Sequence, residues 1–130
     1  MDKEEIVKLR EHLRRSLGSQ LINVVQSAQG DAAEVRLGER KVGALSADEE
    51  DGDRSFFFEM TMPVERAALQ DYLRKLFENN KLTIVGRAKK TDSVELNNGS
   101  DFLGVITADD PNGKSYTLEM AILDIDLDDL

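Results

Sequence analysis

The chain has 130 residues, no cysteine and a formal net charge of −9, from 26 acidic and 17 basic side chains. The lack of cysteine excludes disulfides, thiolate metal sites and cysteine nucleophiles, and the acidic balance argues against a nucleic-acid partner, because binding to a phosphate backbone needs lysine and arginine. No apolar run approaches the roughly 20 residues of a membrane-spanning helix, and the charged N-terminus does not resemble a secretory signal. We therefore expect a cytoplasmic protein with no membrane partner.

The first half of the chain predicts one helix followed by strands. Apolar residues recur at steps of three and four over residues 2–17, with Asp2 and Glu5 placed to cap the start and Gly18 to end the helix. Strands are expected over 21–28, 33–37, 41–46 and 54–61, with an acidic turn at 47–53. In the last strand Phe56 and Phe58 should face together with Phe57 opposite, so we expect both faces to need cover.

The second half predicts the same order. Pro63 suits the first position of a helix over 63–78, and strands are expected over 81–88, 93–96, 102–107 and from 115 onward. The C-terminal tail alternates, which predicts a half-buried edge strand with its aspartates on one face. Those aspartates either form an acidic interaction face or protect a sheet edge from aggregation; they are Asp124, Asp126 and Asp128.

The two halves are related by an internal repeat. A shift of 60 residues pairs Leu13 with Leu73 and Met60 with Met120, and a shift of 61 pairs Gly43 with Gly104, among other matches. The repeat predicts an α+β fold made by tandem duplication of a helix followed by three to four antiparallel strands, with units at 1–62 and 63–130. We expect the units to pack about a pseudo-twofold axis in one compact domain, because some strands carry apolar residues of both parities.

Residues 65–130 resemble a small alphaproteobacterial family, domain of unknown function 3126. The resemblance rests on Tyr-Leu-Arg-Lys at 72–75, Lys-Lys-Thr-Asp-Ser at 89–93, Phe-Leu-Gly-Val at 102–105 and Met-Ala-Ile-Leu-Asp-Ile-Asp-Leu at 120–127. The first half matches only through the repeat and lacks the lysine pair and the tail. The resemblance implies a bacterial cytoplasmic protein and brings no known activity.

Specific chemistry has little support in the sequence. Both acidic glycine turns fail the calcium-loop template, which needs Asp at position one and Glu at position twelve, and no nucleotide-binding or nucleophile motif is present. The only histidine, His12, matches Tyr72 in the repeat and predicts an amphipathic ring at the margin of the core. A basic cluster that could contact an anion consists of Arg87, Lys89 and Lys90.

These observations favour a non-enzymatic protein-interaction module with no cofactor or metal, binding an unidentified protein through a sheet edge, an acidic face or a helix groove. The candidate interaction face comprises the tail aspartates and the basic cluster. One alternative is a small acidic chaperone of the secretion type. Another, of a different class, is a small-ligand protein or enzyme that uses carboxylates such as Asp109 and Asp110. We expect a monomer or a homodimer.

Overall fold

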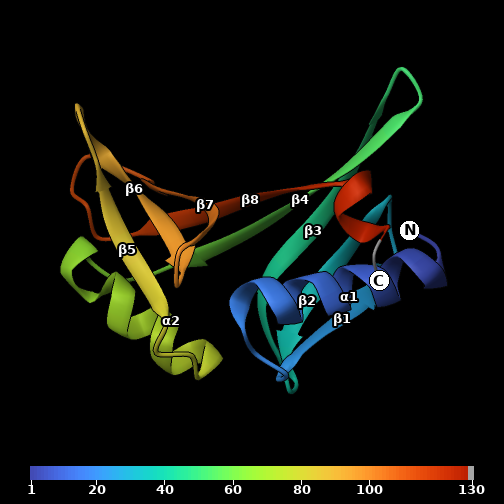
Figure 1. Ribbon diagram of the computed structural model, residues 1–130, viewed down its shortest axis with the longest axis horizontal. Coiled ribbons are helices and arrows are strands. Elements are labelled where there is room, and N and C mark those ends of the chain that lie inside the picture. Colours follow the sequence, from blue (N-terminus) through green and yellow to red (C-terminus); the bar gives the residue numbers. More distant parts are fainter. Residues whose placement is uncertain (129–130) are drawn as a thin grey trace.

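The computed structural model describes residues 1–128 of the chain. Two helices, eight strands and two short 3-10 helices follow one another along these residues (Figure 1). In chain order they are α1 (Lys3–Leu17), β1 (Ile22–Gln26), β2 (Ala32–Leu37), β3 (Arg40–Glu50), β4 (Asp53–Met62), η1 (Arg66–Ala68), α2 (Leu69–Phe77), β5 (Leu82–Arg87), β6 (Lys90–Asn98), β7 (Asp101–Ala108), β8 (Tyr116–Leu123) and η2 (Asp124–Leu127).

All eight strands form one antiparallel sheet in the order β1-β2-β3-β4-β8-β7-β6-β5. The halves meet where β4 pairs with β8, from Ser55 opposite Leu123 to Met62 opposite Tyr116. Glu59 and Glu119 lie opposite each other in this pairing and are also equivalent in the repeat, so the pseudo-twofold axis passes between them.

The fold class predicted from the sequence is therefore wrong. The protein is mostly one eight-stranded antiparallel sheet with two short helices, and is not an assembly of two α+β units packed against each other. Main-chain hydrogen bonds between β4 and β8 join the halves edge to edge, which removes one edge from each half. The apolar residues on the second face of these strands are not covered by another layer: Phe57, for example, stays exposed on that face, whereas Phe56 and Phe58 are buried on the other.

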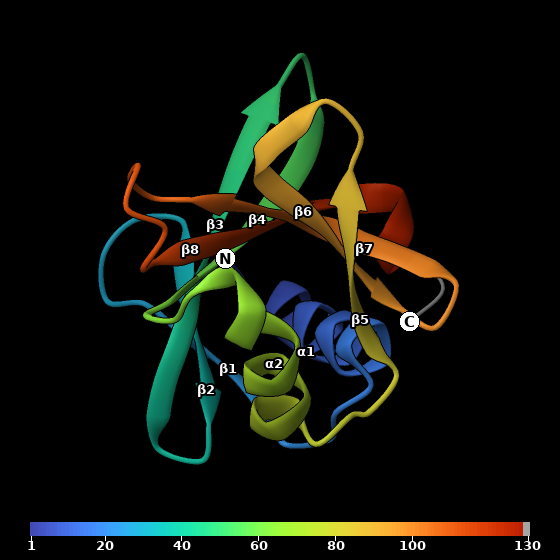
Figure 2. The ribbon, with the colours of Figure 1, turned by 90° about the vertical axis from the view of Figure 1, so that its left-hand side faces the viewer.

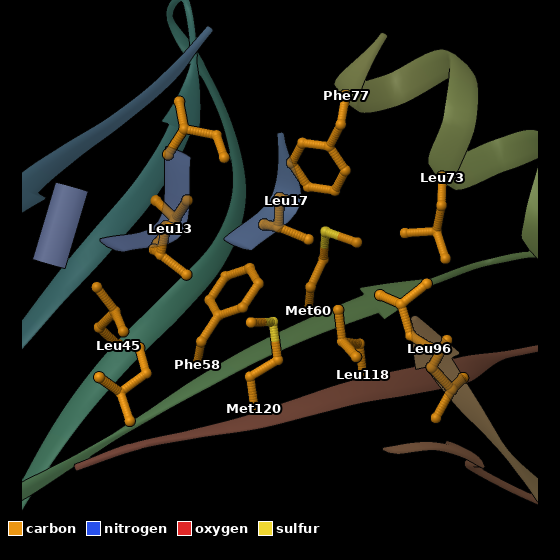
Figure 3. Close-up of a cluster of buried hydrophobic side chains, with 14 of the residues drawn as sticks. Leu13, Leu17, Leu45, Phe58, Met60, Leu73, Phe77, Leu96, Leu118 and Met120 are labelled. Carbon is orange, nitrogen blue, oxygen red and sulfur yellow. The ribbon is translucent and has the colours of Figure 1, made fainter. Parts of the chain in front are cut away.

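Both helices lie on the same face of the sheet, beneath the paired strands β4 and β8 (Figures 1 and 2). Figure 3 shows the side chains of α1 and α2 converging on those of the two central strands. The cluster is one continuous core, to which Leu17, Phe58, Phe77 and Met120 contribute from four different elements. A single core explains why a chain of this size needs no disulfide.

Local signals set the ends of α1 as predicted. The carboxylate of Asp2 accepts the main-chain N–H of Glu5 at 2.8 Å, and the Glu5 side chain accepts the N–H of Asp2 at 3.2 Å. Gly18 ends the helix in the left-handed conformation, with φ of 65°, where a glycine has no steric cost. Both predicted ends of this helix are confirmed.

The second helix begins later than predicted. Pro63 does not open it: residues 63–65 are irregular, a 3-10 turn follows, and α2 begins only at Leu69. The N–H of Val64 bonds to the carbonyl of Met62 at 2.9 Å, so the chain turns sharply after β4 before it can become helical. The helix ends at Glu78, which takes the left-handed conformation that Gly18 has in the first half.

Side chains of α1 and α2 form hydrogen bonds with main-chain groups of the two edge strands, β1 and β5. The Arg14 guanidinium donates to the carbonyl of Ile22 in β1 at 2.8 Å, and its repeat partner Arg74 donates to the carbonyl of Leu82 in β5 at 2.6 Å. The Gln70 side chain also accepts the N–H of Ile84 in β5, at 3.0 Å. An added strand would have to displace these bonds, so both edges are partly closed to pairing. Among the described residues, no helix is long and apolar enough to cross a membrane.

Candidate interaction surface

The face of the sheet opposite the helices has no covering layer. We call it the open face and define it by the side chains of β4 and β8 that alternate away from the core: Ser55, Phe57, Glu59, Thr61, Thr117, Glu119, Ala121 and Leu123. Their neighbours in sequence, such as Phe56 and Phe58, are completely buried. The strand period of two thus separates a core face from a face that is free to contact another molecule.

Apolar side chains occupy the part of the open face between the Glu59–Glu119 pair and the C-terminal end of β8. Phe57 lies opposite Ala121, and Leu123 lies diagonally across from Phe57. Phe57 is 41% exposed, Leu123 is 53% exposed, and Ile125, just beyond the end of β8, is 70% exposed. Exposed apolar side chains that lie together in this way are typical of a contact surface.

Acidic side chains lie on both sides of this apolar group. On one side Glu59 and Glu119 face each other across the pseudo-twofold axis, about 7 Å along the strands from Phe57 and Ala121. Neither carboxylate forms an ion pair with any residue in the described range. Like charges directly opposite in a sheet destabilise it, so this pair is not explained by folding.

On the other side lies a cleft of about 470 Å³. It lies between the projecting β3–β4 hairpin and η2, at the right of Figure 1. We call it the acidic cleft; its lining residues are Asp48, Glu50, Asp51, Asp53, Arg54, Ser55, Leu123, Asp124 and Ile125. None of its five carboxylates has an ion-pair partner within residues 1–128.

Arg54, the only basic residue of the cleft, is already neutralised. Its guanidinium donates to Asp31 at 2.8 Å and to Glu5 at 3.1 Å, and it stacks 5.2 Å from the ring centre of Phe56. Hydrogen bonds from Arg54 and from the N-terminal amino group of Met1 hold the pKa of Asp31 well below its ordinary value. The same ion cluster raises the pKa of Arg54. The cleft therefore presents a net negative charge to a ligand.

The tail aspartates do not form the predicted edge strand. Residues 124–127 form the 3-10 helix η2, in which Leu127 is buried and Ile125 is exposed, and β8 is a central strand. A 3-10 helix repeats every three residues, so the alternation of apolar and acidic residues does not place them on two faces. Asp124 lines the cleft, whereas Asp126 accepts the N–H of Leu123 at 2.9 Å. Asp128 follows as an exposed residue, and residues 129 and 130, the end of the predicted tail strand, lie outside the described residues.

The structure does not bring the basic cluster to the tail. Arg87, Lys89 and Lys90 lie at the β5–β6 hairpin, at the opposite side of the molecule from η2 (Figure 1). Arg87 donates to Ser93 at 3.1 Å and lies 3.8 Å from the carboxylate of Glu95. Lys89 has φ of 67° in the turn. The two halves of the predicted interaction face are therefore separate surfaces.

Of the two carboxylates suggested for catalysis, that of Asp109 has local partners. Asp109 accepts hydrogen bonds from the hydroxyl groups of Ser115 and Thr117, the latter at 2.7 Å, within the β7–β8 turn. Asp110 accepts the main-chain N–H of Gly113 at 3.3 Å through its carbonyl. Within residues 1–128, no three acidic or histidine side chains are grouped so that they could hold a metal ion. These contacts stabilise the turn between β7 and β8.

His12 lies at the margin of the core, as the repeat predicted. It is half-buried on α1, and its ring lies 3.3 Å from the hydroxyl of Ser16. Burial lowers its pKa, although the charge of Asp126 in η2 acts in the opposite direction.

Sequence reasoning missed most of the cleft. It assigned the acidic segment after Ala47 to a turn, whereas β3 continues to Glu50 and the hairpin projects from the sheet. Phe57 was expected to be covered because it alternates with two core phenylalanines. One signal was available in the sequence: Arg54 is the only basic residue between Lys41 and Arg66. Its ion pairs with Glu5 and Asp31 anchor the base of the β3–β4 hairpin to the rest of the protein.

Comparison with known families gives one match. The model of the family described as "Protein of unknown function (DUF3126)" matches residues 5–63 and again residues 65–126. The two matches confirm both the predicted resemblance and the presence of two copies of one domain. No curated protein and no solved structure shows a significant match to the chain.

Proposed function

The chain belongs to the DUF3126 family, whose function is unassigned, and we propose that it is a non-enzymatic protein-interaction module that binds its partner through the open face. The observation that carries the proposal is the group of three exposed apolar side chains, Phe57, Leu123 and Ile125, beside unpaired carboxylates. Burial of such a group against a partner is favourable, because it removes apolar area from water.

The other interaction modes have less support. Arg14, Arg74 and Gln70 occupy main-chain groups of the edge strands, which opposes the addition of a partner strand. The helices direct Leu13 and Leu73 into the core, and within the described part of α1 and α2 only one large apolar side chain, Val7, is exposed. The open face is the surface that folding leaves unused.

The test compares two variants in their capacity to capture and bind a partner. Phe57→Ser combined with Leu123→Ser removes the apolar group, and Phe102→Ser is the matched control, because Phe102 is 59% exposed on β7 and lies outside the open face. We expect a protein captured by wild type and by the control, but not by the double variant, whose affinity for that purified partner is at least about tenfold lower.

Unchanged urea-unfolding midpoints would show that both variants are folded, since all three side chains are exposed. Equal affinity of the double variant and the control for the captured partner would refute the open face as the binding surface.

A further inference from the structure

The open face carries a charge pattern that specifies the kind of partner, and this inference rests on the function proposed above. Along β4 and β8 the surface is acidic at the cleft, apolar at Phe57, Ala121 and Leu123, and acidic again at Glu59 and Glu119. Both groups are negatively charged, and within residues 1–128 neither the five cleft carboxylates nor Glu59 and Glu119 form an ion pair.

Folding does not explain this arrangement. Glu34 and Glu95 belong to the same row of the sheet as Glu59 and Glu119, and both have partners: Arg36 lies 2.6 Å from Glu34, and Arg87 lies 3.8 Å from Glu95. Carboxylates at the ends of this row are thus neutralised within the chain, whereas those at its centre are not. The unpaired charges lie where the apolar group is exposed.

Charge complementarity limits what can cover this face. A second copy of the chain would place like charges against each other across the same surface, and a phosphate backbone or an anionic membrane would be repelled by it. A lone cation would leave Phe57 and Leu123 exposed. The occupant that satisfies both features has an apolar centre flanked on both sides by positive charge.

We propose that the open face binds a segment of a partner protein in which an apolar side chain is flanked on both sides by lysine or arginine. The apolar side chain packs on Phe57, Ala121 and Leu123. One flanking cation enters the acidic cleft near Asp53 and Asp124, and the other lies over Glu59 and Glu119.

The span agrees with a short segment. Along β8, Ala121 is two residues from Glu119 and two residues from Leu123, which lines the cleft, and each step corresponds to roughly 7 Å along an extended strand. Lysine and arginine side chains of a bound segment reach across such distances while their aliphatic stems cover apolar surface.

The test uses synthetic peptides as defined probes with the intact protein. The first peptide has a phenylalanine–leucine centre with lysines on both sides. A second has the same composition with every lysine on one side, and a third replaces the lysines with glutamate. We expect wild type to bind the first at least about fivefold more tightly than the second, and to show no binding of the third. The affinity for the first peptide should fall at least about tenfold between about 0.02 M and 0.3 M salt, because exposed ion pairs are screened.

Protein variants show whether binding occurs at this face. Glu59→Gln with Glu119→Gln should weaken the first peptide about fivefold, and Asp53→Asn with Asp124→Asn should do the same. The control, Glu65→Gln with Asp71→Asn, removes two exposed charges from the η1–α2 segment and should leave the affinity unchanged. Urea unfolding monitors the folded state of each.

The outcomes separate this inference from the proposed function. Three results would refute the proposed charge pattern of the partner: equal affinity for the first two peptides, an equal effect of the control variant, or no binding of the first peptide. Each would do so even if the Phe57→Ser, Leu123→Ser variant still loses its captured partner. Concentration-dependent dimerisation that this variant abolishes overturns it as well, because the occupant is then a second copy.

Discussion

Replacement of Gly104 by alanine should destabilise the protein strongly, because the backbone of the neighbouring strand occupies the space of the new side chain. A Cβ atom at Gly104 would overlap the carbonyl oxygen of Glu119 and approach Cγ of Met120 to 2.8 Å. The repeat partner Gly43 is similarly enclosed, with the carbonyl oxygen of Glu59 and a ring carbon of Phe58 both at 2.6 Å.

The magnitude follows from which atoms can move. Overpacking of a core costs about 1–3 kcal/mol, and the upper end applies here, because β8 is held along its length by its pairing with β4 and cannot retreat from β7. With a urea m-value of about 2 kcal/mol/M, a loss of about 3 kcal/mol lowers the unfolding midpoint by about 1.5 M. Gly43→Ala should lower it by a similar amount.

Gly86→Ala is the matched control. The nearest atom to a Cβ there is the end of the Arg66 side chain, at 3.2 Å, which can move aside. We expect a change within about 1 kcal/mol, stabilising if the restriction of the unfolded chain dominates. Urea unfolding followed by circular dichroism measures all three variants. A midpoint for Gly104→Ala equal to that of Gly86→Ala would refute the argument that the close approach of strands β7 and β8 requires glycine.

Three further predictions concern the helix end, the sheet edge and acid stability. Glu78→Gly should stabilise the protein by about 0.5–1 kcal/mol, because Glu78 holds a left-handed conformation that costs a non-glycine residue about 1–2 kcal/mol. Gly18→Ala, at the equivalent position of the first half, should destabilise the protein. Equal unfolding midpoints for the two variants would contradict this role of the left-handed conformation. Gln70→Ala combined with Arg74→Ala should free main-chain groups of β5 and cause concentration-dependent self-association in light scattering, whereas a monomer at all concentrations would show that these side chains do not protect the edge. Asp31→Asn should lower the free energy of unfolding at neutral pH, because the lowered pKa of Asp31 means that its ionised form stabilises the fold. This difference in stability from wild type should shrink as the pH falls below about 4, the ordinary pKa of aspartate. A difference that does not change with pH would contradict this role of the Asp31 carboxylate.

Local signals in the sequence were sufficient for several elements. The capping pair Asp2 and Glu5, the leucine stripe and Gly18 together determine α1, because these interactions lie within a few residues of one another. The internal repeat likewise revealed two copies of one family domain. The alternation around Phe56 and Phe58 correctly placed both rings on one face.

Long-range pairing decided the rest. No local pattern near Ser55 or Leu123 predicts that β4 and β8 will pair. This pairing joins the two predicted units into one sheet with one core. It also leaves Phe57 exposed and sets Glu59 against Glu119, because strand pairing, not local pattern, decides which side chains become neighbours. The sequence by itself determined α1, the alternation around Phe56 and Phe58, and the duplication. Only the tertiary structure determined where α2 begins, that the tail forms a 3-10 helix, and that one face of the joined sheet stays uncovered, with acidic residues on both sides of an apolar group.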